Sequence, residues 1–263
     1  MVWSILFYLM PEINIVIPCY NEAARLQSER FCVFLHEHAE VALLFVNDGS
    51  IDSTQQVLEE MQQRIPEQID ILHLPVNSGK AEAVRRGLSL LDSNNPGTWY
   101  GYWDADLSTP LEEIFYLLSS VKESTRMILG SRVKRLGSAI QRKVWRHISG
   151  RIMATLISWT LNLAVYDTQC GAKLIHREML GVIIDKPFLS KWLFDVEIIS
   201  RLRIAYHDRP VNSVFFEVPL RQWIDVDDSK LKLHHIPKAL LDLVKIRKAY
   251  SKHTKKFKRK TRP

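Results

Sequence analysis

Two carboxylates placed two residues apart are the feature of this sequence with the clearest chemistry. Asp104 and Asp106 directly follow an apolar, aromatic stretch that ends at Trp103. In an extended strand, residues i and i+2 point to the same face, so both carboxylates would be directed to one place as the strand ends. Mg²⁺ and Mn²⁺ take oxygen ligands, often one or two carboxylates plus phosphate oxygens of a substrate. The pair therefore predicts a metal site that binds a diphosphate, although such pairs also occur in solvated turns.

The elements that must position this pair alternate over the first hundred residues. Short apolar runs indicate strands, and apolar residues at helical spacing indicate helices between them. We expect strands near residues 12–18, 41–46, 69–74 and 99–103, with helices near 23–38, 54–64 and 80–91. This order predicts an α/β fold with a mainly parallel central sheet flanked by helices.

Polar motifs follow each of these predicted strands. They lie at residues 18–22, 47–50, 77–80 and 104–108. Ligands of parallel α/β sheets bind beyond the carboxyl ends of the strands. Four unrelated solvated turns would not all fall at one edge of a sheet, so we expect a single ligand site there.

Three residues of these motifs have an individual chemical interpretation. Asp48 ends the second strand, where its carboxylate would accept from a base N–H or a ribose hydroxyl, and Gly49 would let the backbone approach the ligand. Lys80 follows a glycine at a predicted helix start, where the helix N-terminus and the ammonium both favour phosphate. The alternatives are an ordinary Asn-Asp-Gly turn and a solvated lysine.

The second half of the chain is less regular. We expect helices near residues 110–121, 140–164 and from 194 onward, strands near 127–130 and 214–219, and a turn followed by a strand over residues 167–174. The long pattern that ends near residue 164 has a broad apolar face. It predicts either a core helix or an interfacial helix that receives a lipid chain.

Composition describes an ordinary globular chain of 263 residues, with 46% hydrophobic and 25% charged residues. This length suits one large α/β domain or two small ones. The chain has three cysteines, Cys19, Cys32 and Cys170, and none of them forms a Cys-x-x-Cys motif. That pattern argues against a disulfide framework or a zinc site and favours a reducing compartment.

The net charge of +7 comes from the C-terminal end of the chain. Residues 245–263 contain ten Lys or Arg and no acid, so the remainder carries about −3. The acidic body disfavours a nucleic-acid groove on the fold itself. The basic tail is a solvated segment, or it is attracted to anionic lipid headgroups or to nucleic acid. The apolar stretch 2–10 is too short to span a bilayer and has the wrong flanks for a signal peptide.

A series of motifs in this order resembles the family 2 glycosyltransferases: IVIPCYNEAARL, VNDGSIDST, NSGKAEAVRRG, DADLSTP, GSR, DTQCGAKL, FDVE and SKL. Over residues 11–232 the chain is more narrowly similar to the branch of dolichyl-phosphate glucosyltransferases and other polyprenyl-phosphate glycosyltransferases. DTQCG followed by FDVE is more specific to that branch than NDGS or DAD. The resemblance implies a GT-A fold, which is a Rossmann-like nucleotide-diphospho-sugar transferase. It also implies inverting transfer of a sugar, glucose by preference, from a UDP-sugar to a dolichyl or undecaprenyl phosphate.

The resemblance also implies roles for individual residues. Asp104 and Asp106 would bind Mg²⁺ or Mn²⁺ and stabilise the leaving diphosphate, with Ser108 standing where related mannosyltransferases have a helper Gln. The residues expected to contact nucleotide, donor or acceptor are Pro18, Tyr20, Glu22, Asp48, Gly49, Lys80, Gln169 and Lys230.

The acceptor side is expected to be cationic, because a phosphate monoester needs positioning rather than a strong base. Arg132, with Arg142 or Lys143, would bind this phosphate, since arginine suits phosphate geometry. Asp195 would contact acceptor or sugar. Asp195 and Glu197 do not share a helix face, so we expect only one of them to point inward.

We expect an N-terminal lead-in over residues 1–10, one GT-A domain over 11–244 and a basic tail over 245–263. The domain would comprise a nucleotide-sugar half to about residue 109 and an acceptor half from 110. The enzyme would be cytoplasmic and peripheral at the cytoplasmic membrane face. Two alternatives remain. One is a family 2 enzyme with a saccharide acceptor in surface-polymer assembly, in which Asp195 or Glu197 is the base. The other is a non-catalytic nucleotide-sugar-binding or basic-tail interaction protein.

Overall fold

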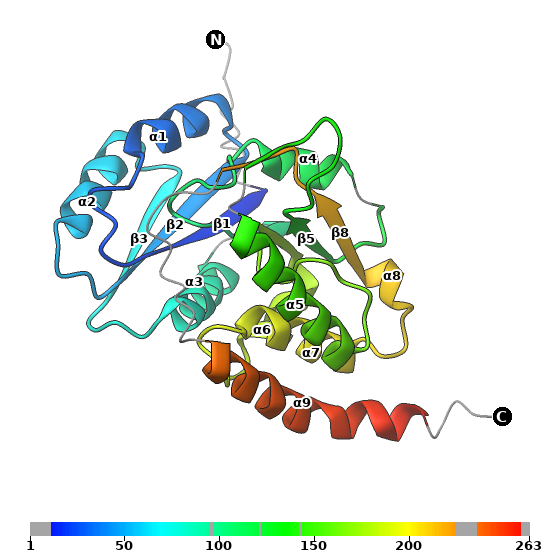
Figure 1. Cartoon of the computed structure of the whole chain (residues 1–263). Helices are drawn as coiled ribbons and strands as arrows, with labels where there is room; N and C mark the ends of the chain where they lie inside the picture. The colour runs from blue at the N-terminus through cyan, green and yellow to red at the C-terminus, as the bar shows by residue number, and fades with distance from the viewer. Residues whose placement is uncertain (1–11, 95–96, 121, 142–143, 225–235, 259–263) are drawn as a thin grey trace, which may run out of the picture.

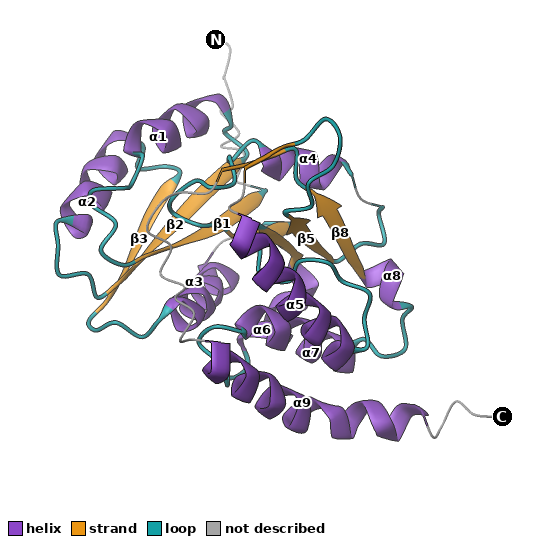
Figure 2. Ribbon diagram, in the orientation of Figure 1, coloured by secondary structure: helices purple, strands orange, loops and turns teal. Residues whose placement is uncertain are grey.

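The computed structural model describes residues 12–94, 97–120, 122–141, 144–224 and 236–258. In these ranges a seven-stranded sheet forms the centre of the protein, and helices cover both of its faces (Figure 1, Figure 2). The expected lead-in over residues 1–10 lies outside the described residues.

The first half alternates strands and helices as the sequence predicts. Its elements are β1 (Ile13–Cys19), α1 (Ser28–Glu37), β2 (Val41–Asp48), α2 (Thr54–Arg64), β3 (Ile69–Leu74), α3 (Lys80–Asn94) and β4 (Trp99–Tyr102). β1 pairs in parallel with β2 and β4, and β2 pairs in parallel with β3. Helix α1 begins later than expected, because the amides of Arg25 and Leu26 bond to the carbonyl of Glu22 and form turns instead.

The second half contains shorter elements. They are α4 (Glu113–Ser119), β5 (Met127–Ser131), β6 (Ala139–Gln141), α5 (Val144–Leu161), β7 (Lys173–His176), a 3₁₀ turn η1 (Arg177–Met179), α6 (Leu180–Ile184), α7 (Phe194–Ala205), α8 (Val211–Val214), β8 (Phe215–Pro219), β9 (Gln222–Ile224) and α9 (Ile236–Lys258). The helix expected from residue 140 was wrong at its start. Residues 139–141 form β6, which pairs with β9 in a separate two-stranded sheet.

The strand order of the large sheet is β3-β2-β1-β4-β7-β5-β8. All its pairings are parallel except those of β7, which runs antiparallel to both β4 and β5. The prediction of a mainly parallel α/β sheet is therefore confirmed. The register sets Lys173 opposite Tyr102, the last residue of β4. β7 consequently brings the second half of the chain directly beside the strand that precedes Asp104 and Asp106.

Apolar side chains fill both faces of the sheet. Phe31 of α1, Leu58 of α2 and Ile114 of α4 are buried on one face, and α3, α6 and α7 cover the other. β2 is buried along its whole length. Burial on both faces is the reason that parallel strands read as continuous apolar runs.

Helices α5 and α9 are only partly covered. In α5, Ile157 and Leu161 are buried, whereas Ile152 is 61% and Trp159 is 72% exposed. The helix therefore contributes both to the core and to the surface. Helix α9 runs continuously through residues 244 and 245, where the basic tail was expected to begin. Among the helices of the described residues, none is both long and apolar enough to cross a membrane.

Candidate active site

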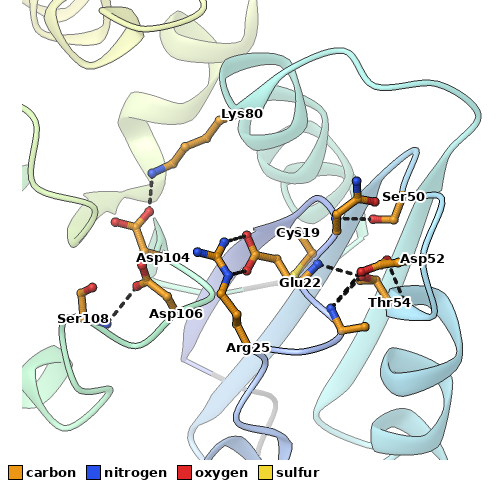
Figure 3. A network of polar contacts seen from close by, with 12 residues as sticks. Cys19, Glu22, Arg25, Ser50, Asp52, Thr54, Lys80, Asp104, Asp106 and Ser108 are labelled. Atoms are coloured by element: carbon orange, nitrogen blue, oxygen red, sulfur yellow. Dashed lines mark hydrogen bonds and ion pairs between the residues drawn. The ribbon is translucent and has the colours of Figure 1, made fainter. Parts of the chain in front are cut away.

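Asp104 and Asp106 lie in a tight turn rather than at the end of an extended strand. β4 ends at Tyr102, and the amide of Leu107 donates to the carbonyl of Asp104 at 3.3 Å. Leu107 has a positive φ of 52°, which folds the chain back. The strand-based argument for shared direction was thus wrong in its geometry, but the turn still sets both carboxylates side by side (Figure 3).

The two carboxylates have different partners. The ammonium of Lys80 pairs with Oδ1 of Asp104, while the amide of Ser108 donates to Oδ1 of Asp106 at 2.9 Å. Burial alone would raise the pKa of Asp104, but the attraction of Lys80 lowers it below its ordinary value. Burial and the neighbouring charge of Asp104 raise the pKa of Asp106. The environments of the two acids therefore shift their pKa values in opposite directions.

The backbone of Gly171 packs directly against the carboxylate of Asp104. A Cβ atom at position 171 would lie 1.8 Å from Oδ2 of Asp104, so only glycine permits this contact. Neighbouring carboxylates from one turn, with a cation already resting on one of them, form a donor set that fits a hard divalent ion. Among the residues described by the structure, no group of three or more His, Cys, Asp or Glu side chains could hold a metal.

The loops after β1 and β2 are hydrogen-bonded to each other. The amide of Asn21 donates to Ser50 Oγ at 3.0 Å, and the amide of Ile51 donates to Asn21 Oδ1 at 3.0 Å. The carboxylate of Glu22 receives two bonds from Arg25, at 2.7 and 3.0 Å. The structure thus gathers two of the predicted polar motifs at one edge of the sheet. Contact of Pro18, Tyr20 and Glu22 with a nucleotide stays a prediction.

Asp48 and Gly49 join the second loop to the third. The two carboxylate oxygens of Asp48 accept from the amides of Ser78 and Gly79, at 2.7 and 2.8 Å. Gly49 has φ +65°, and a Cβ there would lie 2.5 Å from the nitrogen of Asn77. These contacts fix the backbone that leads into Lys80, the first residue of α3. The observed roles of both residues are loop positioning, and their contact with a ligand stays a prediction.

Asp195, at the start of α7, belongs to a buried polar cluster beneath the aspartate pair. Lys173 Nζ lies 2.7 Å from Asp195 Oδ1. The hydroxyl of Tyr102 donates to the same oxygen, and Gln169 Nε2 donates to Oδ2 at 3.3 Å. Lys173 is fully buried and also donates to the carbonyl of Cys170. The sequence analysis did not identify Lys173 or Tyr102 as site residues. A lysine inside an apolar strand could have indicated a buried ion pair.

Glu197 is buried as well, which corrects the expectation that only one of the two acids points inward. Its carboxylate accepts from Arg201 at 2.9 Å, from the hydroxyl of Tyr250 at 2.7 Å and from the amide of Leu189 at 2.7 Å. Glu197 therefore links α7 to α9. Asp195 instead contacts residues next to the aspartate pair.

Arg132, in the loop after β5, makes a two-pronged ion pair with Asp167. Its Nε and Nη2 donate to the carboxylate at 2.7 and 2.8 Å. Burial would raise the pKa of Asp167, but the guanidinium of Arg132 holds it far below its usual range. Glu217 on β8 in turn accepts from the amides of Tyr166 and Asp167, at 2.8 and 2.7 Å. Sequence reasoning missed Asp167 and Glu217 because their partners lie far along the chain.

Three predicted phosphate-binding residues cannot be placed. Arg142, Lys143 and Lys230 lie outside the described residues. The segment over residues 166–171 nevertheless joins the two sides of the site. Asp167 holds Arg132, Gln169 contacts Asp195, and Gly171 supports Asp104.

Comparisons with known proteins identify the family of the chain. The model of glycosyl transferase family 2 matches residues 14–183. The chain is 30% identical over 247 residues to a dolichyl-phosphate beta-glucosyltransferase of Trichomonas vaginalis, which covers 89% of this chain and 72% of that protein. It is 29% identical over 264 residues to the dolichyl-phosphate beta-glucosyltransferase of Saccharomyces cerevisiae, covering 90% and 75%.

Solved structures show the same architecture. The chain is similar to glucosyl-3-phosphoglycerate synthase of Mycobacterium tuberculosis in complex with Mn²⁺ and UDP-glucose, with a TM-score of 0.64 and 19% identity. The match covers 90% of this chain and 79% of that one. The likeness confirms the GT-A fold. The chain belongs to glycosyl transferase family 2, and it is a glycosyltransferase enzyme.

Proposed function

We propose that this enzyme transfers glucose from UDP-glucose to a polyprenyl phosphate, such as dolichyl phosphate, with inversion at the anomeric carbon. The observation that carries the proposal is the segment over residues 166–171. It supports Asp104 on the donor side through Gly171 and holds Arg132 on the acceptor side through Asp167. One short loop thereby sets the distance between an acidic and a basic half of the site.

The donor side suits a metal-bound diphosphate. Asp104 and Asp106 would hold Mg²⁺ or Mn²⁺, and the ion would supply electrostatic stabilisation of the charge that develops on the departing nucleoside diphosphate. Lys80, at the start of α3, would add a positive charge next to the same group. The structural neighbour crystallised with Mn²⁺ and UDP-glucose supports this choice of ion and donor.

The acceptor side suits an anionic nucleophile. Arg132 has a third guanidinium nitrogen, Nη1, that Asp167 does not engage. Arg151 of α5 stacks 3.5 Å above the ring of Tyr166, next to Asp167 in the chain. Two arginines therefore flank the 166–167 segment, where they would orient a phosphate monoester for attack on the anomeric carbon. The relatives named dolichyl-phosphate beta-glucosyltransferases support this acceptor.

A saccharide acceptor would need a carboxylate base, and the contacts of Asp195 do not favour that role. Its oxygens already accept from Tyr102, lie within ion-pair distance of Lys173 and accept from Gln169. Glu197 is occupied by Arg201 and Tyr250. Both carboxylates therefore accept hydrogen bonds from buried side chains and are not available as a base. This favours an acceptor such as a phosphate monoester, which is already anionic.

The enzyme would work as a peripheral protein at the cytoplasmic membrane face. Trp159 of α5 and Leu241 and Val244 of α9 are 72%, 63% and 50% exposed. The guanidinium of Arg247 lies 5.5 Å from the Trp159 ring centroid, so basic and apolar groups share this surface. Such a surface suits anionic lipid headgroups. Replacing Lys252, Lys255 and Lys256 with Gln should weaken binding to phosphatidylserine vesicles and spare UDP binding. Equal vesicle binding would refute this part of the proposal.

The activity is tested by transfer of radiolabelled glucose from UDP-glucose in the presence of Mn²⁺. Dolichyl phosphate, undecaprenyl phosphate, dolichol without phosphate and a soluble oligosaccharide should be compared as acceptors, and GDP-glucose as a second donor. We expect lipid-linked product with the two polyprenyl phosphates and background levels with dolichol and the oligosaccharide. Efficient labelling of the oligosaccharide, without labelling of either polyprenyl phosphate, would overturn the proposal.

A further inference from the structure

The two oxygens of Asp104 have distinct surroundings. Oδ2 packs against the backbone of Gly171, where a Cβ atom would lie only 1.8 Å away. Oδ1 would lie 2.6 Å from the same Cβ atom, and it pairs with the ammonium of Lys80 (Figure 3). A cation that binds Oδ1 of Asp104 must therefore compete with the ammonium of Lys80.

The side chain of Lys80 can move away from Asp104, whereas the buried side chain of Lys173 cannot move away from Asp195. The side chain of Lys80 is 41% exposed, and it extends from the first residue of α3. Its backbone is fixed, because the amide of Gly79 donates to Asp48 at 2.8 Å. Lys173 is fully buried and paired with Asp195 at 2.7 Å. A long, flexible side chain on a fixed backbone allows the ammonium of Lys80 to move without rearranging the loop.

The charges of the cluster agree with such an exchange. Asp104 pairs with the ammonium of Lys80 and Asp195 with that of Lys173. Asp106 accepts from the amide of Ser108 in the same turn as Asp104. Lys173 neutralises Asp195. If Lys80 withdraws, Asp104 and Asp106 retain two negative charges, which match one divalent cation.

We infer that Lys80 is an exchangeable counter-ion of Asp104. It occupies Oδ1 when no metal is bound, and a divalent ion that binds Asp104 displaces it. The freed ammonium then becomes available to the donor diphosphate. Metal binding and nucleotide binding are thereby coupled through one side chain, in addition to any direct metal–phosphate contact. This inference rests on the metal role proposed above for Asp104.

The exchange has a counter-intuitive consequence: removing a residue of the site should improve metal binding. Mn²⁺ binding to the full chain, without nucleotide, should be followed by the electron paramagnetic resonance of free Mn²⁺. Lys80→Met and Lys80→Gln should each bind Mn²⁺ about fivefold more tightly than the wild type, because a partly exposed ion pair is worth up to about 1 kcal/mol. Lys80→Arg, which keeps the charge, should stay close to the wild type.

Arg86→Met is the matched control. Arg86 lies on the same helix and pairs with Glu82 at 2.8 Å, away from Asp104. This variant removes one positive charge without vacating the carboxylate, so its Mn²⁺ affinity should change by less than about twofold. Thermal unfolding of each variant establishes that it is folded.

A second readout separates exchange from general electrostatics. In the wild type, saturating UDP should already have drawn Lys80 away from Asp104. The ratio of Mn²⁺ dissociation constants without and with UDP should therefore be about fivefold smaller in Lys80→Met than in the wild type. With UDP bound, the two proteins should bind Mn²⁺ with similar affinity.

Two results would overturn the inference, and they have different meanings. If Asp104→Asn abolishes Mn²⁺ binding but Lys80→Met and Lys80→Gln bind no more tightly than wild type, the exchange is wrong and the metal site stands. If Asp104→Asn retains full Mn²⁺ affinity, the metal role proposed for Asp104 fails and the exchange fails with it.

Discussion

The two halves of this enzyme, to which we assign the nucleotide-sugar (to about residue 109) and the acceptor (from 110), are held together by different kinds of contact. In the first half, loops after neighbouring strands are joined mainly by backbone amides that donate to short polar side chains, as in Asp48 with Ser78 and Gly79. In the second half, buried ion pairs join separate elements, as in Arg132 with Asp167 and Lys173 with Asp195.

This difference has consequences for tolerance to change. Loss of one neutral or backbone hydrogen bond costs about 1 kcal/mol, since water or a neighbouring group often replaces it. Loss of one member of a buried ion pair leaves an uncompensated charge in the interior and costs about 3–5 kcal/mol. We therefore expect the acceptor half to respond sharply to single substitutions and the nucleotide half to respond gradually.

The largest effect is expected for Lys173→Met. The variant leaves Asp195 buried without its cation, so the free energy of unfolding should fall by about 3–5 kcal/mol. Urea unfolding measures this loss. Lys191→Met, at an exposed position near Gly79, is the control and should change stability by less than about 0.5 kcal/mol. If Lys173→Met were as stable as Lys191→Met, the buried ion pairs would not make the acceptor half more sensitive to substitution than the nucleotide half.

A smaller, pH-dependent effect is expected for Asp167→Asn. Its pairing with Arg132 lowers the pKa of Asp167 in the folded protein, so the stabilisation is present above the unfolded pKa, about 3.9, and is lost as the pH falls toward the folded value. Asparagine keeps one oxygen that accepts from Arg132, so the loss should be smaller than for a removed ion-pair partner, about 2–3 kcal/mol at pH 7. This difference in stability from the wild type should narrow below about pH 4. Urea unfolding of both proteins between pH 7 and pH 3 measures this difference in stability. A difference that does not change with pH would contradict the ion pair between Asp167 and Arg132.

In the nucleotide half, Asp48→Asn should cost about 1–2 kcal/mol of stability. An asparagine presents one acceptor and one donor to the two amides of Ser78 and Gly79, so one hydrogen bond is lost. The altered loop precedes Lys80, and UDP affinity should therefore fall together with stability. Calorimetric titration with UDP checks the second effect. A loss of stability above that of Lys173→Met would reverse the proposed order.

The smallest effect is expected for Tyr250→Phe, which removes one hydroxyl from the contact between α9 and Glu197. That hydroxyl donates to Glu197 at 2.7 Å, and Arg201 still donates to the same carboxylate. The loss should be about 1 kcal/mol. Thermal unfolding measures the loss, and Tyr206→Phe, which removes one hydroxyl bond to the carbonyl of Glu178 at 2.8 Å, is the comparison. An unchanged melting temperature of Tyr250→Phe would mean that apolar packing alone attaches α9.

What the sequence predicts well is local. Strand-end motifs of the nucleotide half lie where parallel topology requires, so the grouping of residues 18–22, 47–50 and 77–80 follows from the order of elements alone. The pairing of Asp104 with Asp106 was also predicted. Its geometry was not, because a left-handed Leu107 turns the chain before any strand could continue. Turn conformation at a non-glycine residue leaves no strong signal in composition.

What the sequence does not predict is distant pairing. Arg132 was identified as a phosphate-binding candidate, but its partner lies 35 residues away in a different element. The antiparallel insertion of β7 between β4 and β5 sets Lys173 opposite Tyr102, and the α/β alternation of the first half gives no hint of it. The helix predicted from residue 140 also included residues of β6, a strand of three residues that pairs with β9.

The central claim is that Asp104 and Asp106 hold the metal through which the donor diphosphate binds. It is tested most directly by titrating UDP-glucose into the full chain with and without Mn²⁺, for the wild type, Asp104→Asn and Asp106→Asn. We predict that Mn²⁺ raises the affinity of the wild type by at least about tenfold, worth about 1.4 kcal/mol, and that neither variant shows this gain. A full Mn²⁺-dependent gain in both variants would contradict the account.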